Sequence, residues 1–172
     1  MTESSEPAEP QGSPHILIIS APYYEDVAGP LLEGATGVLE GLGISYELVT
    51  VEGALEIPQA FAAAVEVGLV PRHSAEGGRF DGVVVLGCVI RGETSHYDVV
   101  VNNTNHWLMD IAISEAIPVG NAILTVDTKE QAMKRANGQN GKGGDAARAC
   151  AGLIEVQRKF MDERKSLWAE DK

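Results

Sequence analysis

The sequence has few of the residues from which most metal and redox sites are built. Only two of its 172 residues are cysteines, Cys88 and Cys150, and they form no Cys-x-x-Cys motif. The four histidines form no His-x-x-x-His pair, and His96 and His106 would lie on different faces of a shared helix, since each residue turns a helix by roughly 100°. We therefore predict no metal site, and we expect both cysteines to be buried apolar side chains.

Basic charge and long apolar runs are also scarce. The 13 Lys and Arg residues are outnumbered by 25 Asp and Glu residues, which gives a formal net charge of −12 at pH 7. Because nucleic acids and anionic membranes attract basic surfaces, this balance argues against both as partners. No apolar run approaches the roughly 20 residues that span a bilayer. The N-terminus has neither the basic start nor the apolar stretch of a signal peptide, so we expect a cytoplasmic protein.

What remains has the size and composition of one soluble globular domain. The chain is long enough to bury a substantial core, and its 44% hydrophobic and 22% charged residues are typical of such domains. Residues 1–14 are rich in Pro, Glu and Ser, and we expect them to form a disordered tail. Residues 15–161 would form the single domain, and residues 162–172 would fray.

Short apolar runs alternate along this domain with segments of helical periodicity. The expected strands are residues 15–20, 45–51, 81–90 and 119–126, and the expected helices are residues 26–42, 56–67, 95–116, a segment after Thr128, and 145–161. The 81–90 run is continuously apolar, which is typical of a strand covered on both faces. The alternation predicts an α/β fold: a three-layer α/β/α, flavodoxin-like arrangement around a central, mostly parallel sheet of about four strands in uncertain order.

The longest predicted helix follows the most apolar strand. It opens with Ser95-His96-Tyr97-Asp98, a variant of the capping box with Asp in place of Glu or Gln. The residues expected on its buried face are Val100, Thr104, Trp107, Leu108 and Ile111.

Ligands of such folds bind beyond the carboxyl ends of the strands. The turns expected at that edge are residues 21–26, 52–56, 91–96 and 127–128. Tyr23 and Tyr24 lie in the first of these turns, where one ring could stack on a planar heterocycle. A tyrosine pair that merely covers the first helix is the alternative.

The 91–96 turn has the features of an anion site. A helix that begins near Ser95 leaves the backbone N–H groups of Glu93, Thr94 and Ser95 without helical partners, at the positive end of the helix dipole. Gly92 would allow a ligand to approach the backbone closely. The dipole also disfavours a charged imidazole, and a neutral His96 beside a phosphate could accept and donate protons. The alternatives are a helix start that binds only water and an exposed histidine that makes a cap contact.

A basic segment stands out from the acidic background. Between residues 129 and 148 there are two acids and five basic residues, namely Lys129, Lys134, Arg135, Lys142 and Arg148. This favours a small anionic ligand, with a solvated helix face as the alternative. The GQNGKGG stretch is not a P-loop, because its spacing differs, no Ser or Thr follows the lysine, and a helix precedes it. No Gly-x-Gly-x-x-Gly follows a predicted strand, and no Gly-x-Ser-x-Gly elbow is present.

Taken together, these segments resemble the 6,7-dimethyl-8-ribityllumazine synthase family over about residues 15–160. The stretches that carry the resemblance are PYYEDVAGPLLEGA, VEGALEIP, LGCVIRGETSHYD, ILTVDTKEQAMKRA and GKGGDAA. The resemblance implies an enzyme of riboflavin biosynthesis that joins 5-amino-6-(D-ribitylamino)uracil to 3,4-dihydroxy-2-butanone 4-phosphate, without cofactor or metal. It also implies a homo-oligomer, most simply a pentamer with its sites between subunits; a 60-subunit shell remains open.

The resemblance assigns roles by position. His96 would transfer protons, and Tyr23 would stack on the pyrimidine. Glu93 and Thr94 would offer N–H groups to the phosphate, with Arg135 as its charged partner. The other implied substrate-binding residues are Ala54, Leu55, Glu56, Cys88, Val89, Ile90, Asn121 and Lys142, with Asp145 near the lysine.

The chain departs from the family's pattern at a few positions. Asn121 stands where many members have a phenylalanine that covers the pyrimidine from a neighbouring subunit, and Pro22-Tyr23-Tyr24 replaces a common Arg-Phe-Asn. The loop between Arg135 and Lys142 is about one residue shorter than usual. A catalytically weakened relative that binds flavin- or pterin-like ligands is therefore the alternative function, and a shell-forming structural protein is a third.

Overall fold

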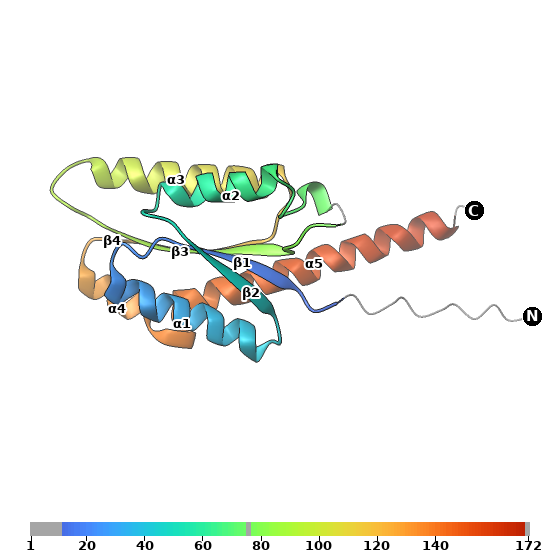
Figure 1. The fold of residues 1–172 in the computed structure, drawn as a ribbon, viewed down its shortest axis with the longest axis horizontal. Helices are drawn as coiled ribbons and strands as arrows, with labels where there is room; N and C mark the ends of the chain where they lie inside the picture. Colours follow the sequence, from blue (N-terminus) through green and yellow to red (C-terminus); the bar gives the residue numbers. More distant parts are fainter. Residues whose placement is uncertain (1–11, 75–76, 171–172) are drawn as a thin grey trace, which may run out of the picture.

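The computed structural model describes residues 12–74 and 77–170 of the chain (Figure 1). Most of the expected disordered tail, residues 1–11, lies outside these residues. Pro14 precedes the first strand, and its carbonyl accepts a hydrogen bond from the backbone N–H of Ser45 (3.3 Å). In the described part of the chain, no helix is both long enough and apolar enough to cross a membrane.

Four parallel strands form one sheet in the order β2-β1-β3-β4. The strands are β1 (His15–Ser20), β2 (Ser45–Thr50), β3 (Gly82–Ile90) and β4 (Val119–Val126). The predicted fold and strand positions are confirmed, with end differences of one residue. From β1 the chain adds β2 on one side of the sheet and then β3 on the other. The carboxyl ends of β1 and β3 therefore flank a topological switch point, where open α/β sheets bind ligands.

Helices cover both faces of the sheet (Figure 1). Helices α1 (Glu25–Gly41), α4 (Lys129–Ala136) and α5 (Lys142–Glu170) lie on one face, and α2 (Glu56–Glu66) and α3 (His96–Ser114) lie on the other. Alternate strand residues serve the two layers: Ile16 and Ile18 face the first, whereas Leu17 and Ile19 face the second. Two short 3₁₀ turns, η1 (Arg72–Ser74) and η2 (Gly138–Asn140), complete the described elements.

Helix α5 is longer than the sequence predicted. It begins at Lys142 rather than Asp145 and continues past Met161 to Glu170, so residues 162–170 extend the helix as a projection from the body (Figure 1). Side chains one turn apart support the extension: Lys159 pairs with Glu163 (3.9 Å), and the Arg164 guanidinium lies over the Trp168 ring (4.7 Å). No proline or glycine interrupts these last turns.

Helix α3 differs from the prediction at its N-cap and on its buried face. Ser95 is its N-cap, but the serine side chain makes no cap hydrogen bond; instead, the Thr94 hydroxyl accepts one from the backbone N–H of His96 (3.3 Å). The predicted capping box is therefore wrong. Trp107, expected on the buried face, is 52% exposed, because the buried stripe follows Val100, Thr104, Leu108 and Ala112 at a spacing of four residues.

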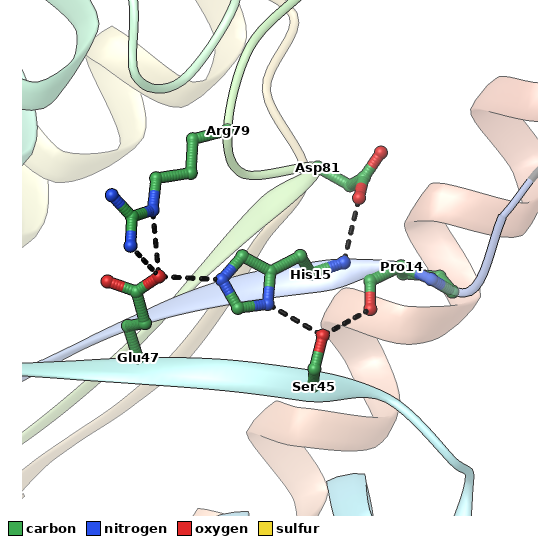
Figure 2. A network of polar contacts seen from close by, with 6 residues as sticks. All are labelled: Pro14, His15, Ser45, Glu47, Arg79 and Asp81. Atoms are coloured by element: carbon green, nitrogen blue, oxygen red, sulfur yellow. Dashed lines mark hydrogen bonds and ion pairs between the residues drawn. The ribbon is translucent and has the colours of Figure 1, made fainter.

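A network of side-chain hydrogen bonds links the amino ends of β1 and β2 (Figure 2). The His15 ring lies between the Ser45 hydroxyl (2.6 Å) and the Glu47 carboxylate (2.9 Å), and Glu47 also accepts a hydrogen bond from Arg79 (2.8 Å). Hydrogen bonds from His15 and then from Arg79 lower the pKa of Glu47. Because the strands are parallel, this network lies at the edge of the sheet opposite to the switch point.

Helices α1 and α5 cross so closely that only glycine fits at the contact. A Cβ atom on Gly143 would lie 2.0 Å from the carbonyl oxygen of Leu31, whereas a Cβ on Gly152, farther along α5, would meet nothing within 4 Å. Gly143→Ala is therefore expected to lower the free energy of unfolding by about 1–3 kcal/mol. Gly152→Ala, the matched control, should raise it by about 0.5–1 kcal/mol through helix propensity. Urea unfolding of both variants measures the difference, and equal stabilities would contradict the close crossing.

Candidate active site

A pocket of about 320 Å³ lies at the switch point, beyond the carboxyl ends of β1 and β3. It opens between the turn after β1, the start of α2 and the start of α3. The residues predicted from the sequence that line it are Tyr23, Ala54, Leu55, Glu56, Cys88, Val89, Ile90, Thr94 and His96. Three of the four turns expected at this edge therefore meet around one cavity. The fourth, after β4, contributes no lining residue in a single chain.

The inner wall of the pocket is an unpaired edge of β3. Pairing between β1 and β3 ends at Ser20 and Leu86, whereas β3 continues to Ile90 against β4 alone. Leu86 directs its carbonyl towards β1, where it accepts a hydrogen bond from Ala21 (2.9 Å). Since backbone direction alternates along a strand, Cys88 and Ile90 direct their N–H and C=O groups to the same side, past the end of β1. No described strand pairs with them there, so donors and acceptors face the cavity.

The outer wall is made by the loop from Arg91 to Ser95 and the first turn of α3. His96 is the first helical residue and is exposed to solvent, and Thr94 lies beside it on the pocket wall. Within the described chain, no group accepts a hydrogen bond from the backbone N–H groups of residues 93–95. These N–H groups lie at the positive end of a 19-residue helix, so the loop can receive an anion.

A second helix also begins at the pocket. Glu56 is the first residue of α2, and Ala54 and Leu55 form the turn before it. The Glu56 side chain is exposed at the mouth, where its carboxylate can accept hydrogen bonds from hydroxyl groups. The pocket thus combines a carboxylate on one side with unpaired N–H groups on the other.

Two aromatic rings stand at the entrance. Tyr23 is 71% exposed and meets Tyr24 edge to face, with 5.0 Å between ring centroids. Tyr24 is half-buried, and burial raises the pKa of its hydroxyl. Tyr23 therefore keeps a ring face free to stack on a planar ligand, held by a better-packed neighbour.

Cys88 is a wall residue and not a nucleophile. Burial first, and the charge of Asp26 second, raise the pKa of its thiol to about 11. At neutral pH the side chain therefore stays a protonated thiol, whereas the reactive form of cysteine is the thiolate. Among the described residues, no group of three or more His, Cys, Asp or Glu side chains is arranged to hold a metal ion.

Four predicted site residues do not line this pocket. Glu93 is an exposed residue of the loop and does not line the cavity. Asn121 lies on the exposed edge of β4, where its amide contacts Asn105 (2.9 Å). Arg135 is exposed in the last turn of α4 and donates to the Gln131 carbonyl (3.1 Å), and Lys142 pairs with Asp145 (2.9 Å) at the start of α5.

Tyr24 and Gly92 also line the pocket, in the turns where the sequence indicated an aromatic ring and a close approach to the backbone. Gly53, Tyr97 and Val100 line it as well and were not predicted as site residues. Val100 could have been found, because it lies four residues after His96 and so shares its helix face. Tyr97 lies in the first turn of α3, and no periodicity in the sequence signals that its side chain lines the pocket.

The sequence is similar to known proteins over most of its length. The family model described as 6,7-dimethyl-8-ribityllumazine synthase matches residues 13–158. A 6,7-dimethyl-8-ribityllumazine synthase of Agrobacterium fabrum is 48% identical over 148 residues, covering 86% of this chain and 97% of the relative. A 6,7-dimethyl-8-ribityllumazine synthase 1 of Rhizobium meliloti is 47% identical over 152 residues, covering 87% and 95%. The resemblance predicted from the sequence is confirmed, and the chain belongs to the 6,7-dimethyl-8-ribityllumazine synthase family.

Proposed function

We propose that the protein condenses 5-amino-6-(D-ribitylamino)uracil with 3,4-dihydroxy-2-butanone 4-phosphate to form 6,7-dimethyl-8-ribityllumazine, phosphate and water. The observation that carries the proposal is the unpaired edge of β3 at Cys88 and Ile90, which faces the cavity. A uracil ring has an N–H group flanked by two carbonyls along one edge, and a strand edge presents complementary donors and acceptors. Tyr23 supplies a ring face for stacking, and Glu56 would accept hydrogen bonds from the ribityl hydroxyls.

The loop after β3 would bind the phosphate of the second substrate. The unpartnered N–H groups of residues 93–95 and the dipole of α3 favour an anion there. With the phosphate bound there, the carbon chain of the substrate would extend towards the amines of the pyrimidine. Since the two substrates are small, much of the rate gain would come from holding them in register, a contribution of up to roughly 7–11 kcal/mol in well-oriented systems.

His96 would serve the proton transfers. The amine condenses with the ketone to a Schiff base with loss of water, phosphate leaves, and the resulting enol tautomerises to a ketone. The second amine then attacks this ketone and closes the ring with loss of a second water. Each of these steps moves a proton near the phosphate end of the substrate, where His96 lies next to Thr94 on the cavity wall. An imidazole can both accept and donate these protons near neutral pH.

A second copy of the chain would complete the site, as in a pentamer. Asn121 of β4, Arg135 of α4 and Lys142 of α5 are exposed and lie outside the cavity of their own chain. Helix α3 carries large apolar side chains that its own chain leaves exposed: Val99, Trp107, Met109 and Ile113. Burying such a patch against a neighbour would bring a cationic surface to an open phosphate site. Arg135 would then bind the phosphate, with Lys142 nearby.

The proposal is tested by mixing the purified protein with both substrates and following the green fluorescence of the lumazine. Product should form much faster than in a control mixture of the two substrates without protein. Binding of the pyrimidine without any acceleration would contradict the proposal and would favour a binding protein. Light scattering on the same sample measures the size of the assembly.

A further inference from the structure

Arg91 begins the loop that precedes His96. It directly follows β3, and its backbone N–H donates a hydrogen bond to the carbonyl of Val126 at the end of β4 (2.9 Å). The side chain does not line the pocket. Instead, it reaches from the start of the loop to the first turn of α3, where the loop ends.

The Arg91 guanidinium meets three groups from two elements. Its Nε donates to the Asp127 carboxylate (3.1 Å) in the turn after β4, and its Nη2 lies 3.4 Å from the Asp98 carboxylate of α3. The planar group also lies over the Tyr97 ring, 4.0 Å from the ring centroid. Both carboxylates stabilise the charged form, and the hydrogen bond to Asp127 is the main cause of the raised pKa of Arg91.

The Arg91 side chain bridges the loop of residues 92–96. Its backbone lies at the start of the loop, and its guanidinium contacts Tyr97 and Asp98 just after the end of the loop. Asp127 then ties it to the turn after β4, where the Asp127 backbone N–H donates to the Gln131 side chain (2.9 Å) of α4. A single side chain therefore fixes the distance between the two ends of the loop and the position of the loop against the neighbouring turn.

We propose that Arg91 is a positioning residue that holds the loop amides and His96 where the phosphate of the substrate must sit. The role rests on the proposed function and acts through the loop, since Arg91 does not touch the cavity itself. The contacts need a planar fork: separate nitrogens meet Asp127 and Asp98 while the plane stacks on Tyr97. A lysine ammonium carries the same charge but cannot make all three contacts at once.

A positioning role and a general stabilising role for Arg91 predict different effects on the reaction and on the stability of the fold. All the partners of Arg91 are partly exposed, and exposed ion pairs contribute little to the free energy of unfolding. A displacement of about 1 Å in a group that orients a substrate, in contrast, can cost up to about a hundredfold in rate. Loss of Arg91 should therefore affect the reaction far more than the melting temperature.

The test compares Arg91→Ala and Arg91→Lys with a matched control, Arg79→Ala. Arg79 also pairs with a carboxylate, that of Glu47 (Figure 2), and its guanidinium lies over the Phe80 ring, 5.7 Å from the centroid. These contacts lie at the opposite edge of the sheet. Arg91→Ala is expected to raise KM for the butanone phosphate about tenfold and to change KM for the pyrimidine less than about twofold. KM for the butanone phosphate in Arg91→Lys should stay within about threefold of its value in Arg91→Ala. In Arg79→Ala, KM for both substrates should equal that of the unmodified protein.

Crystal structures of the unmodified protein and Arg91→Ala, in one crystal form, supply a readout that needs no activity. The B-factors of residues 92–96 relative to β3 should rise in the variant. Unchanged loop B-factors, an unchanged KM for the butanone phosphate, or full recovery in Arg91→Lys would each overturn the proposal. If the unmodified protein forms no lumazine, the proposed function fails, and the loop B-factors alone decide whether Arg91 holds the loop.

Discussion

His96→Ala is expected to lower kcat by about a hundredfold and to leave turnover that is still measurable. Proton transfer by a positioned side chain typically contributes about 10²–10⁴-fold, and the lower end applies where water can replace the missing imidazole. The exposed position of His96 at the first turn of α3 admits such water. The substrates would still be held in register by β3 and the loop, so the contribution from proximity is kept.

The measurement is steady-state kinetics with both substrates at saturation. His73→Ala is the control, because His73 is 69% exposed and lies before β3, at the other edge of the sheet. KM for the pyrimidine should be unchanged in His96→Ala, since the proposed function assigns the binding of that substrate to the edge of β3 and not to His96. An unchanged kcat would remove His96 from the mechanism, and complete loss of activity in a folded protein would mean that the imidazole does more than move protons.

Arg135→Ala is expected to lower kcat/KM for the butanone phosphate by about 10–100-fold, since a hydrogen bond to a charged group is worth about 1.5–3 kcal/mol. Arg135 is exposed in its own chain, and its guanidinium has only the Gln131 carbonyl as a partner among the described residues. Removing it should therefore leave the stability of the chain almost unchanged. Arg135→Lys should restore part of the loss, because it returns the charge without the planar fork.

Lys134→Ala provides the control for charge alone. Lys134 precedes Arg135 on α4 and is also exposed, so the variant removes the same charge from the same helix. Its kcat/KM should stay within about twofold of the unmodified protein if the arginine makes a specific contact. Equal losses in both variants would show that the basic segment acts only through its general field, and not through Arg135.

The fold was largely predictable because its signals are local. The β-branched run of β1 and the apolar run of β3 mark strands, and helical spacing marks α1. Strand order was not predictable, since right-handed crossovers allow more than one order for the same elements. The extent of α5 was also missed: residues 162–168 are exposed, so no buried face marks the helix there, and side-chain pairs one turn apart support it instead.

The turns that form the candidate site could be predicted from the sequence, but the geometry of the pocket between them could not. Tyr23, Glu56 and His96 meet because parallel strands end at one edge, a rule that applies before any coordinates are known. The unpaired edge of β3 depends on where β1 stops, which the sequence does not signal. Sequence periodicity also gives no signal that Arg135 lies outside the pocket that His96 lines, because that depends on where α4 packs in three dimensions.

The most direct test of a pocket shared between two protomers is to co-express His96→Ala and Arg135→Ala chains with different tags and to assay the purified mixed assemblies. If the imidazole and the guanidinium come from different copies, a site is intact wherever the two variants meet in the right order, and roughly a quarter of normal turnover should return. Activity no greater than the weighted sum of the two variants alone would place both groups in one chain and contradict the account.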